Sequence, residues 1–293
     1  MQSFPEPRIL DSIRYRIREP FVAPFCDRHT VLPQQRISLK QRSHLRSRYK
    51  LAARDRPQTE NEERLCAFQD AYKGNEIWLL GNGPSLNELD LSFLKNEITI
   101  GSNGILLGQK EMGFSVTHYV VEDFLVAEDR AEQIRQISTS QVWAGNYLDY
   151  CLGPQASTIW LNVAPFLSRR PKKPKFSFDA RRILYSGGTV SYLCLQLAYF
   201  FGASQVNLVG FDHSYVEPVA KHRFGSIYTS TTADKNHFRE DYFGPGYRWH
   251  RPNVARMERA YEVALSAFES SGRTILNRGV AGNLEVFKRL PLS

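Results

Sequence analysis

The feature that most constrains the fold is a pair of short apolar runs, each of which ends in a small polar loop. Ile77–Leu80 stops at Gly-Asn-Gly-Pro-Ser, and Ile98–Ile100 stops at Gly-Ser-Asn. Brief apolar runs bounded by turn residues predict buried strands, and two of them joined by a short crossover predict parallel pairing. Ligands of such sheets bind at the carboxyl ends of the strands. The two loops are therefore predicted to meet in one site.

The rest of the chain continues this alternation of strand and helix patterns. Further strands are predicted at Thr117–Val121, Gln141–Ala144, Thr158–Leu161, Val206–Gly210 and Arg273–Leu276. Helices are predicted at Leu65–Tyr72, Ile105–Glu111, Leu125–Ile137, Gly188–Phe201 and Asn253–Ser271. The alternation predicts an α/β, doubly wound, mostly parallel sheet of the Rossmann-like kind. Residues 211–252 lack clear periodicity, and a loop of that length in a compact domain is usually a lid or a binding loop.

The net positive charge of the chain resides in its N-terminal segment. The net charge is +8, and residues 1–57 hold thirteen Arg and Lys residues against five acidic ones, so the remainder is neutral overall. We interpret residues 1–70 as a basic arm and residues 75–290 as the α/β domain. The charge is compatible with a solvated extension, or with binding to an anionic membrane or a partner protein. No nucleic-acid-binding motif accompanies it, so no nucleic acid is expected as a partner.

Other classes of protein are disfavoured by the composition. The four cysteines have no Cys-x-x-Cys spacing, which argues against a zinc site or a disulfide framework and favours a reducing cytoplasmic location. The most apolar window, Tyr192–Phe211, is interrupted by polar residues and predicts a buried helix leading into a strand. No Asp-x-Asp pair or metal-ligand spacing is present, so no metal site is predicted.

The loop Gly81–Ser85 departs from both common phosphate-binding patterns. It lacks the Gly-Lys-Ser/Thr ending of a Walker A sequence, and Pro84 and Ser85 do not fit the dinucleotide fingerprint. Glycines permit a close backbone approach, and the N–H groups at the start of the next helix can hold a phosphate. The loop is therefore either a phosphate-binding loop or a tight turn between a strand and a helix.

Three blocks together resemble a known group of enzymes. The first is the sequence GNGPSL after one strand with Ser102-Asn103 after the next; the second runs from Ser186 to Tyr215; the third is Lys235–Phe238. They are similar to the bacterial sialyltransferases of glycosyltransferase family 42 and to the related 6-hydroxymethylpterin diphosphokinase (MptE-like) family, which includes Maf-type flagellin glycosyltransferases. The resemblance covers residues 75–290.

The resemblance implies an inverting, metal-independent glycosyltransferase with a GT-A-like fold and no cofactor. Its donor would be CMP-sialic acid or a related nonulosonate, its acceptor a glycan or glycolipid, and its place the cytoplasm or the inner face of the membrane. His237 would be the general base, with Tyr215 and Tyr228 stabilising the departing phosphate. Contacts to the nucleotide and donor are implied for Gly81, Asn82, Gly83, Pro84, Ser85, Asn103, Ser186, Gly187, Gly188 and Asp212.

Several alternatives stay open at the level of sequence. The other candidates for the base are His118, His213, His222 and His250, and Asp212 could cap a turn instead of binding a sugar hydroxyl. The aromatic cluster Tyr242–His250 could form an acceptor wall or pack on the core. The activity could instead be that of a pyrophosphokinase using Mg-ATP, with Glu122 and Asp123 as Mg²⁺ ligands, or the chain could be a non-catalytic nucleotide-binding module.

Overall fold

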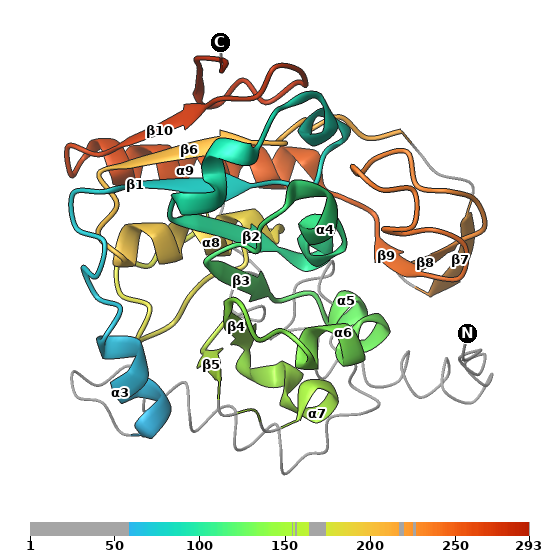
Figure 1. Cartoon of the computed structure of the whole chain (residues 1–293), viewed down its shortest axis with the longest axis horizontal. Helices are drawn as coiled ribbons and strands as arrows, with labels where there is room; N and C mark the ends of the chain where they lie inside the picture. The colour runs from blue at the N-terminus through green and yellow to red at the C-terminus, as the bar shows by residue number, and fades with distance from the viewer. Residues whose placement is uncertain are drawn as a thin grey trace.

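A computed structural model of the chain describes residues 59–153, 155, 157–163, 174–216, 220–224 and 227–292. Its centre is an eight-stranded sheet in the order β11-β10-β6-β1-β2-β3-β4-β5, in which every neighbouring pair is parallel (Figure 1). The strands are β1 (Glu76–Leu80), β2 (Thr99–Ser102), β3 (His118–Val121), β4 (Gln141–Gly145), β5 (Thr158–Leu161), β6 (Gln205–Val209), β10 (Thr274–Asn277) and β11 (Lys288–Arg289). The parallel α/β sheet predicted from the alternating pattern is confirmed, with β11 as a short strand that the pattern did not predict.

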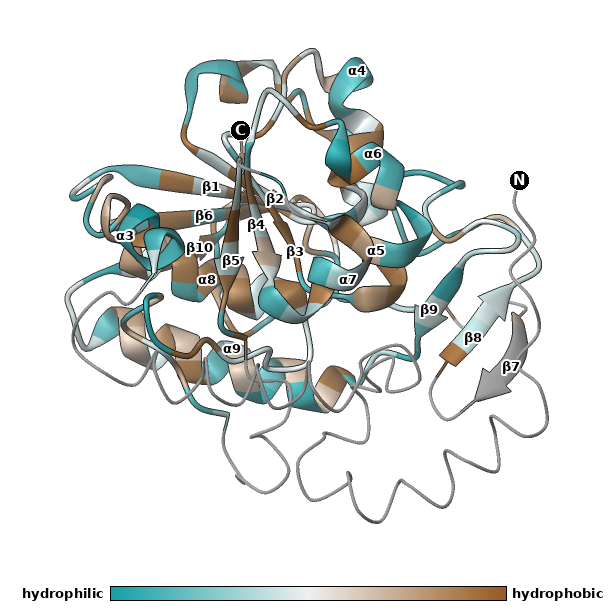
Figure 2. Ribbon diagram, turned by 90° about the horizontal axis from the view of Figure 1, so that it is seen from below, coloured by the Kyte–Doolittle hydropathy of each residue, from teal (hydrophilic) through white to brown (hydrophobic). Residues whose placement is uncertain are grey.

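The strand order shows where the sheet changes direction. The chain proceeds from β1 outward to β5, returns to β6 on the other side of β1, and then continues outward to β10 and β11. The helices α8 (Val190–Phe200) and α9 (Val254–Glu269) pack together on one side of the sheet, while α4 (Gln109–Met112) and α6 (Ala131–Arg135) lie on the other (Figure 2). This is a doubly wound arrangement, and its switch point lies between β1 and β6, where ligands of such sheets bind.

The loops on the β1-to-β5 side contain short helices. The 3-10 helices are η1 (Pro84–Glu88), η2 (Ser92–Asn96), η3 (Asn103–Gly108) and η4 (Asn146–Leu148), and the remaining α-helices there are α5 (Phe124–Asp129) and α7 (Asp149–Leu152). The predicted helix Leu125–Ile137 is thus divided into α5 and α6 at Arg130. Arg130 is 4% exposed, and its guanidinium binds backbone carbonyls of a distant segment. That tertiary contact accounts for the interruption.

The predicted helix Leu65–Tyr72 is wrong. The helix there is α3 (Glu60–Cys66), which begins at the N-cap Thr59, and the chain after it forms consecutive turns. The backbone N–H groups of Asp70 and Tyr72 donate to the carbonyls of Phe200 and Phe201 at the end of α8. Pairing with the end of α8 therefore satisfies donors that a continued helix would have used internally.

Residues 211–252 contain a second sheet that the sequence pattern did not predict. Its antiparallel strands are β7 (Ala220–Phe224), β8 (Ile227–Ser230) and β9 (Arg248–His250), in the order β7-β8-β9, at one end of the main sheet (Figure 1). The nearly buried Arg248 ties β9 to α5 through ion pairs with Glu128, at 2.8 Å, and with Asp129. The small sheet is thereby fixed to the main domain.

His118 belongs to the core. Its Nδ1 accepts a hydrogen bond from Trp143 Nε1 at 3.1 Å, and its Nε2 lies 2.9 Å from the Tyr72 hydroxyl. Since Nδ1 accepts, the proton is on Nε2, which donates to Tyr72. Burial lowers the pKa of His118 to about 4, so the ring is neutral at ordinary pH. This histidine is part of the structural core.

Gln196 of α8 fixes the segment that leads to Ser186. The side chain is completely buried. Its carbonyl oxygen accepts from the backbone N–H groups of Ser177 and Tyr185, and its amide donates to the carbonyls of Tyr185 and Tyr192. One amide thus bonds four backbone groups, three of which belong to the non-helical segment before α8.

The basic arm, and with it the expected contact of residues 1–57 with an anionic membrane, lies outside the described residues apart from its last part, which begins at Thr59. Within the part of the chain that the structure describes, no helix has the length and apolar character needed to cross a bilayer.

Candidate functional site

A cavity of about 360 Å³ lies at the carboxyl ends of β2 and β3. Its walls come from these strand ends, from the first turns of α8 and α9, and from parts of residues 215–257. Of the residues predicted for the site, Asn103, Ser186, Gly188, Tyr215 and His237 line it. The structure therefore brings together residues that are up to 134 positions apart in the chain.

His237 forms a dyad with Asp234. Its Nδ1 lies 2.7 Å from Asp234 Oδ2, and the carboxylate also accepts the backbone N–H groups of Asn236 at 2.8 Å and Phe243 at 3.0 Å. Burial alone would raise the pKa of Asp234, but the hydrogen bond and charge of His237, together with these backbone donors, lower it overall. An ionised Asp234 holds the proton on Nδ1 and leaves Nε2 as the nitrogen that can accept a proton from a substrate.

The N-terminal ends of two helices face the same cavity. The N-cap Thr189 and Val190 of α8, and the N-cap Asn253 and Val254 of α9, are among its lining residues. Both helices are long enough, at 11 and 16 residues, to place a partial positive charge at this end. The cavity is therefore suited to an anionic group such as a phosphate.

Arg256 adds a full positive charge beside these helix N-termini. It lines the cavity together with Arg251, and its side chain packs on Gly188, where an added Cβ would lie 3.1 Å from Arg256 Cδ. Gly188 also has φ +95°, so the turn before α8 depends on glycine both for its conformation and for this close approach. Burial, and then the charge of Arg259, lower the pKa of Arg256, as expected for a cation held away from water.

Three buried polar atoms on lining residues have no hydrogen-bond partner within the described part of the chain. They are Asn103 Oδ1, Ser186 Oγ and Trp249 Nε1. Ser186 is 3% exposed and Trp249 is 7% exposed. Buried polar groups in folded proteins are normally satisfied by protein, water or ligand, so these three atoms mark where a polar ligand would make contact.

Glu122 and Asp123 reach the cavity from the end of β3. Glu122 accepts a hydrogen bond from the Tyr147 hydroxyl at 2.8 Å, and burial raises its pKa to about 7 despite that bond. Asp123 caps α5, because its Oδ1 accepts the backbone N–H of Leu125 at 2.7 Å. In the described ranges, no cluster of three or more His, Cys, Asp or Glu side chains could hold a metal ion.

The loop Gly81–Ser85 lies at the switch point, but none of its five residues lines this cavity. The Ser85 hydroxyl donates to the Asp212 carboxylate, which also accepts the backbone N–H of Ser85 at 2.8 Å. A Cβ on Gly81 would overlap the carbonyl of Gly210, and one on Gly83 would lie 2.6 Å from the Asp212 carboxyl. Asp212 therefore caps the turn after β1, and the glycines allow two strand-end turns to touch.

Asn82 links the first two predicted loops. Its Nδ2 donates to the carbonyl of Ser102 at 3.1 Å, while its Oδ1 is buried without a partner among the described residues. Asn103 adopts the left-handed conformation with φ +52°, and its carbonyl accepts a hydrogen bond from the Tyr119 hydroxyl at 2.7 Å. The two polar loops thus lie side by side, as the parallel pairing of β1 and β2 predicts.

Some of the predicted tyrosines and alternative histidines line the cavity, and others do not. Tyr215 lines the cavity and is 40% exposed, whereas Tyr228 stacks on Trp249 with ring centroids 5.0 Å apart and does not line it. His213 lies 3.5 Å from Glu258 and is not a lining residue, while His250 is one. The side chain of His222 is outside the described part of the structure.

Sequence reasoning did not identify Asp234, Arg251 or Arg256. Asp234 stands three residues before His237, a spacing at which one turn of chain can bring the two side chains together. Arg256 stands three residues after the N-cap Asn253. Both signals are local, and the one at Arg256 has meaning only once α9 is known to begin at the cavity.

Comparisons with known proteins gave a family match and a similar solved structure. A family model described as 6-hydroxymethylpterin diphosphokinase MptE-like matches residues 54–218. A comparison with curated protein sequences gave no match. Among solved structures, the Maf glycosyltransferase from Magnetospirillum magneticum AMB-1 is similar, with a TM-score of 0.46 and 11% identity over 79% of this chain. The match spans 38% of that protein, so this chain corresponds to less than half of it.

Proposed function

The chain belongs to the MptE-like family, and we propose that it is an inverting glycosyltransferase that uses a nucleotide-activated sugar. The observation that carries the proposal is the His237–Asp234 dyad in the same cavity as the N-termini of α8 and α9 and Arg256. The dyad supplies a base for a hydroxyl, and the helix ends with Arg256 supply positive charge for a leaving phosphate.

In the proposed reaction, the acceptor hydroxyl lies within hydrogen-bond distance of His237 Nε2. Its oxygen attacks the anomeric carbon of the donor as the bond from that carbon to the nucleotide phosphate breaks. The hydroxyl proton passes to Nε2, and Asp234 stabilises the resulting imidazolium through Nδ1–H. The electron pair of the broken bond leaves on the phosphate, whose charge the helix ends and Arg256 stabilise. One displacement inverts the anomeric centre.

The donor we propose is CMP-sialic acid or a related nonulosonate, because the GNGPSL, Ser186–Tyr215 and Lys235–Phe238 blocks resemble enzymes that use such donors. Ser186, with Gly187 and Gly188, would hold the donor phosphate or carboxylate. Asn103, beside Asn82, would contact the nucleoside through its amide oxygen, which has no hydrogen-bond partner among the described residues. The turn after β1 would be supported by Gly81, Gly83, Pro84, Ser85 and Asp212. Tyr215 would close the cavity near the phosphate.

The acceptor would be a glycan or glycolipid. Residues 1–57, which carry a net charge of +8, would hold the enzyme at an anionic membrane. Co-sedimentation of the full chain with phosphatidylserine vesicles, but not with phosphatidylcholine vesicles, tests this.

A second candidate function is transfer of diphosphate from ATP to a hydroxymethyl pterin. The family description favours it, and a His237 base would suit a pterin hydroxyl equally well. The residues present fit a magnesium ion poorly. Asp123 already accepts the N–H that begins α5, and Glu122, with its pKa raised to about 7, is substantially protonated at neutral pH.

The two functions can be separated by ligand binding and turnover. Thermal unfolding with CMP, CDP, UDP, GDP and ATP, each with and without Mg²⁺, shows which nucleotide binds the folded state, because such a ligand raises the midpoint by mass action. Stabilisation by CMP without metal, and sugar transfer lost in His237→Gln, are expected. Stabilisation by Mg-ATP alone, with AMP as the product, would replace the first function by the second.

A further inference from the structure

Tyr242 lies directly against the imidazole of His237. The ring centroids are 3.9 Å apart and the rings are inclined by only 7°, so the two stack face to face. Tyr242 is 2% exposed, and burial raises the pKa of its hydroxyl, which keeps it neutral. A neutral, buried ring at this distance restricts the tilt of the imidazole, while the bond to Asp234 fixes its rotation in the plane.

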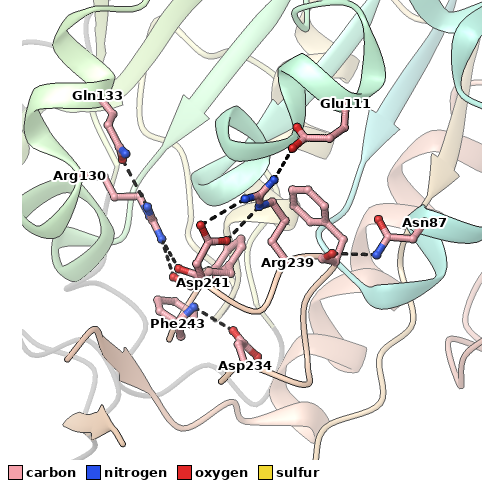
Figure 3. A network of polar contacts seen from close by, with 10 residues as sticks. Asn87, Glu111, Arg130, Gln133, Asp234, Arg239, Asp241 and Phe243 are labelled. Atoms are coloured by element: carbon pink, nitrogen blue, oxygen red, sulfur yellow. Dashed lines mark hydrogen bonds and ion pairs between the residues drawn. The ribbon is translucent and has the colours of Figure 1, made fainter. Parts of the chain in front are cut away.

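Tyr242 is itself held from two directions. Its hydroxyl accepts the backbone N–H of Gly104 in η3 at 3.2 Å, and its ring occupies the space that a Cβ on Gly104 would need. Its backbone carbonyl accepts a hydrogen bond from Arg130 Nη2 at 2.6 Å, and the same nitrogen donates to the carbonyl of Asp241 at 3.1 Å (Figure 3). The Arg130 guanidinium also lies 4.5 Å from the centroid of the Tyr247 ring.

These contacts connect the break between α5 and α6 to the imidazole. We infer that Tyr242, held by Arg130 and by the close approach of Gly104, is the positioning residue that keeps the His237 imidazole in its reactive orientation. The inference rests on the proposed function, because it concerns His237 as the base. Neither Tyr242 nor Arg130 is assigned a chemical step: both act through His237.

The segment around His237 has a second side, which provides matched controls. Phe238 and Gly108 line a separate cavity of about 800 Å³, which His237 and Tyr242 do not line. A Cβ on Gly108 would overlap the Phe238 ring, much as a Cβ on Gly104 would overlap the Tyr242 ring. Gly104 and Gly108 belong to the same 3-10 helix, so Gly104→Ala and Gly108→Ala make similar steric changes toward different neighbours.

The first measurement is spectroscopic and does not depend on knowing the substrate. In the folded full-length protein labelled with ¹⁵N-histidine, stacking places the carbon-bound protons of His237 over the Tyr242 ring, which shifts their resonances upfield. Tyr242→Leu and Gly104→Ala should reduce this shift, while Tyr242→Phe, Phe238→Leu and Gly108→Ala should retain it. An unchanged His237 signal in folded Tyr242→Leu and Gly104→Ala would overturn the inference.

The second measurement is kinetic. Because misorientation of a base slows the chemical step more than binding, kcat should fall about tenfold or more in Tyr242→Leu and Gly104→Ala with the donor KM within about twofold. Tyr242→Phe should stay within about threefold of the wild type. A large loss in Tyr242→Phe would mean that the hydroxyl touches the reacting atoms, and would also overturn a positioning role.

Arg130 provides an independent variant in case the substitutions near Tyr242 do not fold. Arg130→Lys keeps a positive charge but cannot reproduce the guanidinium geometry that reaches both carbonyls. We expect the His237 shift and kcat to fall together in Arg130→Lys, with the donor KM unchanged. If His237→Gln retained full transfer, the proposed base would be wrong, whereas the spectroscopic arm would still report whether Tyr242 orients the ring.

Discussion

The loop Gly81–Ser85 and the segment from Asp234 to Met257 differ in where their polar groups point. The loop is the most recognisable motif of the sequence, yet the Ser85 hydroxyl binds Asp212 and none of its five residues lines the cavity. The later segment contains the four-residue block Lys235–Phe238, and it provides the His237–Asp234 dyad and Arg256. The family match ends at residue 218 and so includes the loop but not the later segment.

The difference separates two tasks that a motif can perform. Gly81 and Gly83 allow the turns after β1 and β6 to touch, which shapes the switch point of the sheet. Reactive groups are then supplied by chain that folds over this edge. A family signature in the loop is thus evidence for a shared scaffold, while the proposed reaction depends on residues outside it.

The largest expected effect concerns His237, the proposed base in the segment from Asp234 to Met257. His237→Gln should lower kcat by about 100- to 1000-fold with little change in the thermal midpoint, because a positioned general base contributes about this much. His213→Gln serves as the matched control, since His213 pairs with Glu258 and is not a lining residue, and it should leave kcat within about threefold of the wild type. Comparable losses in both variants would contradict the assignment of the base.

Arg256→Met tests whether the segment from Asp234 to Met257 binds the donor. The substitution removes a cation from beside the helix N-termini that would hold the donor phosphate, while keeping a long apolar side chain. The donor KM should therefore rise about 10- to 50-fold. Arg259→Met on the exposed side of the same helix is the control and should change KM by less than about twofold. Raising the salt concentration should weaken donor binding in the wild type more than in Arg256→Met.

Ser85→Ala tests whether the loop Gly81–Ser85 has a structural role or contacts the ligand. The variant removes the hydroxyl that donates to the buried Asp212 carboxylate, and it should lower the free energy of unfolding by about 1–2 kcal/mol. The exposed Ser266→Ala should change stability by less than about 0.5 kcal/mol. A donor KM that rises in Ser85→Ala without any loss of stability, measured by urea unfolding and steady-state kinetics, would show that the loop contacts the ligand.

The smallest expected effect concerns Glu122. Burial raises its pKa to about 7 from an ordinary 4.5, so the folded state binds the proton more tightly than the unfolded state does. The resulting stabilisation is complete below pH 4.5 and is lost as the pH rises through 7. Between pH 5 and pH 8 the wild type should lose more stability than Glu122→Gln, which cannot ionise. Parallel pH profiles in urea unfolding would contradict a buried, proton-binding Glu122.

The strands of the main sheet apart from β11 were predictable, because they contain local apolar runs that end at turn residues, whereas β11 consists of Lys288 and Arg289 alone. The predicted helix Leu65–Tyr72 failed because the backbone there pairs with Phe200 and Phe201. The sheet β7-β8-β9 was not predicted, since its strands of three to five residues carry no clear alternation of apolar and polar side chains. Local patterns thus predicted the buried framework and missed the parts that depend on distant contacts.

The same limit applies to the site. Asn103, Ser186 and His237 were identified from short blocks, and the structure places all three around one cavity. Arg256 was not identified, because its role depends on α9 beginning beside the glycine turn that precedes α8. Tyr228 was expected at the phosphate but stacks on Trp249 instead. Spacing along the chain cannot show which face of a strand meets the cavity.

Gln196 has a consequence for how this chain can diverge. It holds backbone groups of Ser177, Tyr185 and Tyr192, and it touches none of their side chains through these bonds. The conformation of residues 177–185, which lead to Ser186, therefore depends on a side chain of α8. In a saturation mutagenesis library, the exposed positions 178 and 182 should accept many residues, while position 196 should accept almost none. Even glutamate would fail there, because a carboxylate cannot donate to the carbonyls of Tyr185 and Tyr192.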